Sequence, residues 1–69
     1  LRYLLHKLAK SLNGSSDEKS EYEILDLWSS NPEASRLLAL AKELPILIPG
    51  SSDRDYKFAY PQYYHIFSR

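Results

Sequence analysis

Residues 45–60, PILIPGSSDRDYKFAY, decide the fold, because the patterning changes here from helical to extended. Prolines bound the apolar run at residues 45–50, which is therefore extended and not helical. Three aromatic side chains then alternate with other residues, as on one face of a strand: Tyr56, Phe58 and Tyr60. The two segments either pair as a β-hairpin, with Pro49 suited to an edge strand, or wrap around the helices.

Upstream of this segment, apolar residues recur at the spacing of amphipathic helices. The first helix spans about residues 1–12 and stops at Asn13-Gly14, because both residues tolerate the left-handed conformation that ends helices. A second begins after Ser20, a good N-cap. A third spans residues 32–44, with Asn31 as its cap and Pro32 at its first position. The candidate core residues are Leu1, Leu4, Leu5, Leu8, Ala9, Leu12, Ile24, Leu25, Trp28, Leu37, Leu38, Leu40, Ala41 and Leu44.

Downstream, Pro61 favours the start of a short last helix. We therefore predict a mainly α fold: one small three-helix domain over residues 1–69, with an extended aromatic C-terminal segment and a short last helix. With 69 residues and no cysteine, the domain must be stabilised by apolar packing. The chain opens at Leu1 and contains no methionine, so we expect a fragment of a larger protein.

Composition excludes several classes of protein. An apolar fraction of 43% and an aromatic fraction of 13% are typical of a folded domain. The longest apolar run, residues 37–41, is far too short to span a membrane, and charged residues interrupt the N-terminus where a signal peptide would be apolar. We expect an intracellular domain, cytoplasmic or nuclear.

No catalytic pattern is present. The two histidines, His6 and His65, lie far apart in sequence and outside any metal-binding motif, and two glycines cannot build a phosphate-binding loop. We therefore predict no enzyme, no cofactor and no metal. Leu1, Leu4 and Leu5 match a Leu-x-x-Leu-Leu pattern that resembles the nuclear-receptor boxes of transcriptional coactivators, which implies docking in a receptor groove. The apolar stripe continues along this helix, which favours the core instead.

Formal net charge is zero, but the charges are unevenly distributed. Residues 1–16 carry three cations and no acid, whereas residues 17–34 carry six acids and one lysine. This distribution indicates complementary packing of the first two helices, two differently charged surfaces, or the ordinary solvated faces of amphipathic helices.

Three helices followed by a hairpin resemble a winged helix-turn-helix, which implies a recognition helix at residues 32–44 and a wing tip at residues 50–55. In that alternative the domain binds nucleic acid, and the residues expected at phosphates are Arg36, Lys42, Arg54 and Lys57. A sequence pI of about 6.9 is low for such a protein, which fits protein interaction better.

The leading hypothesis is a non-enzymatic, regulatory protein-interaction module of a larger protein. The aromatic C-terminus carries more ring surface than three short helices can cover, and tyrosine is enriched at binding hot spots. The expected contact residues are Tyr60, Tyr63, Tyr64 and Phe67, with Arg54 and Lys57 as polar neighbours. A protein partner is expected and a membrane is not, while homodimerisation stays open because a second copy can complete a small core.

Overall fold

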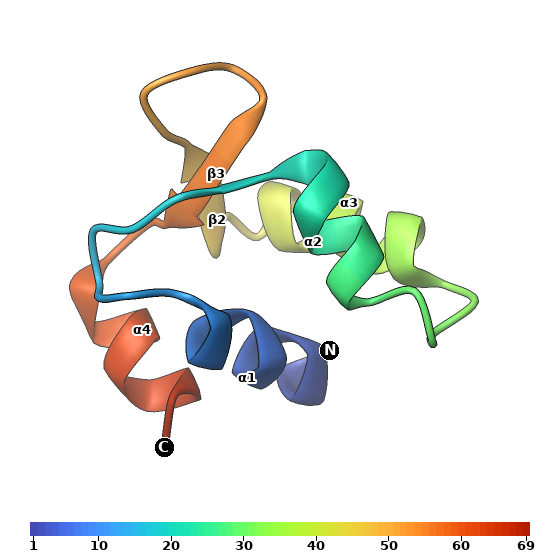
Figure 1. Cartoon of the computed structure of the whole chain (residues 1–69), viewed down its shortest axis with the longest axis horizontal. Helices are drawn as coiled ribbons and strands as arrows, with labels where there is room; N and C mark the ends of the chain where they lie inside the picture. The colour runs from blue at the N-terminus through green and yellow to red at the C-terminus, as the bar shows by residue number, and fades with distance from the viewer.

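A computed structural model describes all residues, 1–69, as four helices and a three-stranded antiparallel sheet. The order is α1 (Arg2–Ser11), β1 (Lys19–Ser20), α2 (Glu21–Leu27), α3 (Ala34–Glu43), β2 (Leu47–Pro49), β3 (Asp55–Phe58) and α4 (Pro61–Phe67) (Figure 1). The helices are found where periodicity predicts them. The fold prediction is confirmed in part: the helices, the short last helix and the hairpin are present, but the three-stranded sheet makes the fold mixed α/β and not purely helical.

The hairpin is confirmed as the arrangement of the C-terminal extended segments. β2 pairs with β3 through Leu47↔Phe58 and Ile48↔Lys57, and Pro49 ends β2 on the edge of the sheet. β1, which the sequence analysis missed, pairs with the other side of β3. Its two residues are polar and too few to show alternation, so only their partners on β3 define them as a strand.

The core lies where α1, α2, α3 and the hairpin meet. α1 contributes most of it, through Leu4, Leu5, Leu8 and Ala9, and Leu12 follows the helix. Trp28, at the end of α2, has no exposed surface, and its indole N–H donates to the Leu4 carbonyl at 2.8 Å. Burial of Leu4 and Leu5 supports the core interpretation of the Leu-x-x-Leu-Leu match.

Local side-chain chemistry sets where α2 begins. The Ser20 hydroxyl accepts a hydrogen bond from the Glu23 amide at 3.1 Å and contacts the Glu23 carboxylate at 3.0 Å. This is a side-chain N-cap, which supplies a partner to one of the amides that a helix start leaves free. The predicted N-cap at Ser20 is therefore confirmed.

The prediction for α3 is wrong in two respects. Its helix begins at Ala34, because Asn31 caps the preceding turn by accepting from the Glu33 amide at 2.9 Å. Its buried residues are Ala34, Leu38 and Ala41, whereas Leu40 and Leu44 are 39% and 55% exposed. The small side chains of Ala34 and Ala41 allow α3 to pack closely on its neighbours. Leu40 and Leu44 lie on the other side of the helix and face outward.

α4 packs against α1, so the two ends of the chain lie on one side of the molecule (Figure 1). Phe67 stacks on Phe58 of β3 with ring centroids 5.9 Å apart. The ring Nδ1 of His6 is hydrogen-bonded to the Phe67 carbonyl at 2.7 Å, in which the carbonyl is the acceptor. None of the four helices is both long and apolar enough to cross a membrane.

Candidate interaction surfaces

The C-terminal aromatics are mostly used inside the fold. Tyr63, Tyr64 and Phe67 are half-buried and pack against the core. Tyr60, at the N-cap of α4, is 58% exposed and meets Tyr63 edge-on with ring centroids 5.5 Å apart. Of the four aromatic residues predicted to contact a partner, only Tyr60 presents most of its surface to solvent.

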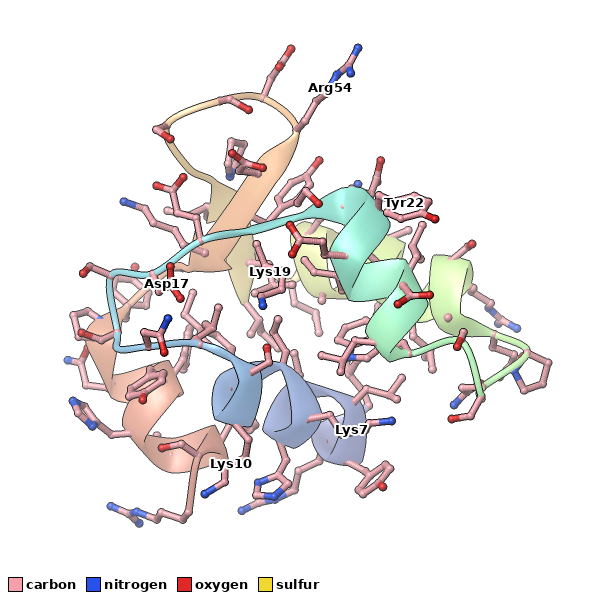
Figure 2. All side chains as sticks on the ribbon, viewed as in Figure 1. Lys7, Lys10, Asp17, Lys19, Tyr22 and Arg54 are labelled. Atoms are coloured by element: carbon pink, nitrogen blue, oxygen red, sulfur yellow. The ribbon has the colours of Figure 1, made fainter.

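The two polar neighbours predicted for these aromatics lie on the hairpin instead. Arg54 projects from the predicted wing tip, residues 50–55, of which residue 55 belongs to β3, and lies at the opposite end of the view from α4 (Figures 1 and 2). Lys57 is half-buried on β3, close enough for its charge to act on Glu18. The structure therefore does not bring Arg54 together with the α4 aromatics.

Arg36 and Lys42, predicted for phosphate contacts, are both engaged with acids. Arg36 forms a 3.2 Å ion pair with Glu33 on the solvent side of α3. Lys42 donates to the Glu21 carboxylate at 2.8 Å and lies 4.7 Å from the centre of the Tyr56 ring. The hydrogen bond to Glu21 raises the pKa of Lys42, so this lysine stays charged while it joins α3, α2 and β3.

The wing tip is attached to the rest of the protein by Glu18. Its carboxylate accepts from the Ser51 amide at 2.9 Å and from the Ser51 hydroxyl at 2.8 Å. These bonds hold the pKa of Glu18 below its ordinary value. A Cβ on Gly50 would collide with the same carboxylate, so the absence of a side chain at Gly50 permits the close approach.

The outward side of α3 forms a shallow apolar surface that the sequence analysis assigned to the core. Leu37, Leu40 and Leu44 follow one another at helical spacing, and the side chains around them are charged. We call this the α3 outer face: Glu33, Arg36, Leu37, Leu40, Glu43 and Leu44. The signal that could have revealed it is the excess of leucines on α3, which occupy more than one side of a helix.

A second surface lies between the ends of α1 and α4, where a groove of about 240 Å³ opens. We call it the α1–α4 groove, and its lining residues are Arg2, Tyr3, His6, Ile66, Phe67 and Arg69. Neither helix contains an acidic residue. Sequence reasoning found the acid-free first helix but could not predict that α4 and Arg69 would join it.

Geometry gives no support to a metal centre. No cluster of three or more histidine, aspartate or glutamate side chains is placed to hold a metal ion. His6 is engaged with the backbone of α4, and His65 stands next to the Tyr64 ring with centroids 5.4 Å apart.

Comparison with known proteins gives no match, whether to a family model, to a characterised protein or to a solved structure.

Proposed function

We propose that this domain is a non-enzymatic protein-interaction module and that it binds its partner through the α3 outer face. The observation that carries the proposal is a leucine stripe on α3 in which Leu40 and Leu44 are exposed and Leu37, beside them, is half-buried against the core. Single exposed leucines are ordinary, but two exposed leucines that continue a half-buried one at i, i+3 and i+7 spacing form the kind of stripe that helices use to bind one another.

The charges around the stripe indicate the chemistry of the partner. Glu43 has no ion-pair partner, and Glu33 is paired only with a neighbour on its own helix. An amphipathic helix with leucine-like residues on one side and Lys or Arg at its margins would complement both features. The C-terminal aromatic surface that the sequence favoured offers Tyr60 as its exposed member, so it would extend such an interface and not form its centre.

The alternative is a winged-helix-like nucleic-acid-binding domain, and the order of the helices and hairpin supports that analogy. Fold analogy alone is a weak argument for function. The helix that would enter a DNA groove carries leucines, Glu33 and Glu43 outward, and both of its cations are paired with acids. A recognition helix needs free donors for phosphates and base edges, so these observations favour the protein partner.

Affinity purification from cells that produce the protein tests the proposal. The wild-type domain, the double variant Leu40→Ser/Leu44→Ser and the control variant Tyr22→Ser are compared by quantitative mass spectrometry. Tyr22 is 81% exposed on α2 and does not belong to the α3 outer face, so its substitution controls for the loss of an exposed apolar group.

We expect a partner that the wild-type domain and the control retain and that the leucine variant loses. With that partner purified, the leucine variant should bind at least about tenfold more weakly, as for other apolar anchors of an interface. Equal retention of every captured protein by the leucine variant would exclude the α3 outer face as the binding surface.

A further inference from the structure

We propose that the α1–α4 groove binds single-stranded nucleic acid, separately from the protein partner proposed for the α3 outer face. The first observation is charge. α1 carries Arg2, Lys7 and Lys10, α4 is followed by Arg69, and these four residues form no ion pair within the chain. A net charge of zero for the whole chain conceals this basic side, because none of the nine acids lies on α1 or α4 and five of them lie on α2 or at the ends of α3.

Position separates these cations from the wing. Figure 2 shows Lys7 and Lys10 on α1, at the opposite end of the view from Arg54. Arg2 and Lys10 are eight residues apart, which is about 12 Å along a helix. Both side chains are exposed, as is Arg69 on the other side of the groove. A flexible chain of phosphates could therefore follow α1 and contact several cations in turn.

The second observation is an aromatic ring at the same place. Tyr3 lines the groove and is 69% exposed, and neither its hydroxyl nor its ring contacts the core. The ammonium group of Lys7 lies 5.8 Å from the centre of the Tyr3 ring. An exposed ring beside unpaired cations is the combination that single-strand binding proteins use, since bases stack on the ring while cations hold the phosphates.

The polar groups of the groove are arranged for such a ligand. The Nδ1 of His6 donates to the Phe67 carbonyl, and no hydrogen bond within the chain uses the other ring nitrogen, Nε2. Ile66 adds an apolar surface on the α4 side of the groove. An acidic peptide would use the cations alone, and a base-paired duplex keeps its bases stacked away from Tyr3. The exposed ring therefore favours unpaired bases.

Anisotropy titrations with labelled twelve-nucleotide probes, one of deoxythymidine and one of uridine, test the inference at 20 mM and 150 mM NaCl. Two matched pairs of variants locate the binding surface. Arg2→Gln/Lys10→Gln is compared with Arg54→Gln/Lys57→Gln, which removes the same charge from the hairpin. Tyr3→Ala is compared with Tyr22→Ala, which removes another exposed tyrosine ring, from α2. Circular dichroism verifies that each variant is folded.

The expected result is a dissociation constant between roughly 10⁻⁶ and 10⁻⁴ M that rises with salt. Arg2→Gln/Lys10→Gln should weaken binding and reduce the slope of log K against log salt by about 0.7 for each lost contact. Tyr3→Ala should weaken binding about fivefold or more, as expected for one stacked base. The hairpin and Tyr22 variants should bind like wild type. Tighter binding of the uridine probe would identify RNA as the ligand. Equal binding of the two probes would mean that the groove recognises phosphates and bases common to RNA and DNA.

Three outcomes would overturn the inference. No binding at 20 mM NaCl would show that the groove is not a nucleic-acid site. Loss of binding in the hairpin variant alone would move the site to the wing. Competition by polyglutamate as effective as that by the oligonucleotide, with no effect of Tyr3→Ala, would mean that the groove selects acidic peptides.

Discussion

Trp28, at the end of α2, is joined to α1 by the hydrogen bond from its indole N–H. Replacing it with phenylalanine keeps much of the ring but removes the N–H that donates to the Leu4 carbonyl and leaves unfilled space. We expect Trp28→Phe to lower the free energy of unfolding by about 2 kcal/mol, from the lost buried hydrogen bond and the imperfect packing. Urea denaturation followed by far-ultraviolet circular dichroism measures the change. The exposed control Tyr22→Phe should stay within about 0.5 kcal/mol of wild type.

Glu18 gives the hairpin a dependence on pH. Its pKa is lower in the folded protein than in the unfolded chain, so the unfolded chain binds a proton more readily as the pH falls. The contribution of Glu18 to stability is therefore complete above its ordinary pKa, about 4.3, and is lost as the pH falls through the lower folded value. Glu18→Gln should make stability less sensitive to pH across this range.

Denaturation at pH 6 and pH 3.5, together with hydrogen exchange at the Ser51 amide, tests this expectation. Glu43→Gln is the control, because Glu43 is exposed and forms neither a hydrogen bond nor an ion pair. An acid dependence that is the same in wild type and Glu18→Gln would contradict the assignment of the effect to Glu18.

Among the elements, α4 decides whether its aromatics stabilise the fold or are available to a partner. Tyr63 and Tyr64 are half-buried against the core, so replacing each with serine should cost about 1–2 kcal/mol of unfolding free energy. The exposed Tyr60, replaced in the same way, should cost less than about 1 kcal/mol. Thermal melts of the three variants provide the measurement, and unchanged stability of Tyr63→Ser and Tyr64→Ser would mean that these rings are free for binding.

Sequence patterns predicted the helices and strands better than they predicted how these elements pack against one another. The cap at Ser20 and the edge position of Pro49 follow from chemistry within a few residues. β1 could not be predicted, because its two polar residues become a strand only through pairing with β3. The assignment of Leu40 and Leu44 to the core was wrong, because the apolar pattern alone does not show which side of α3 packs inward. The side that includes the small Ala34 and Ala41 packs more closely.

The same limit applies to the candidate surfaces. The aromatic C-terminus drew attention as a site because its rings outnumber what three helices can cover, but α4 and the hairpin provide further positions for them. The acid-free character of α1 could be predicted from sequence. The packing of α1 against α4 could not be predicted, because His6 and Phe67 are 61 residues apart and no local pattern relates them.

At the scale of the whole molecule, the charges are separated although their sum is zero. Cations without partners lie on α1 and after α4, whereas none of the nine acids lies on either helix. The α3 outer face and the α1–α4 groove are formed by different helices with no residue in common. The two proposed ligands could therefore bind at the same time, and each proposal can fail without the other.

Small size makes this molecule sensitive to changes in its core. A chain of 69 residues has a free energy of unfolding of roughly 3–10 kcal/mol. The losses expected at Trp28 or Tyr63 are large fractions of that total, whereas exposed positions such as Tyr22 or Leu40 are not part of the close-packed interior. Binding variants on the two surfaces should therefore remain folded when core variants do not.

Because Trp28 is fully buried, its fluorescence can also serve as an intrinsic reporter of the fold. It is the chain's one indole, it has no exposed surface, and it is hydrogen-bonded across the junction of α1 and α2. Its emission should lie toward the blue and resist collisional quenchers for as long as these helices stay together. Because neither proposed surface includes the indole, a change of this signal on ligand binding would report a change in the packing of the core around Trp28.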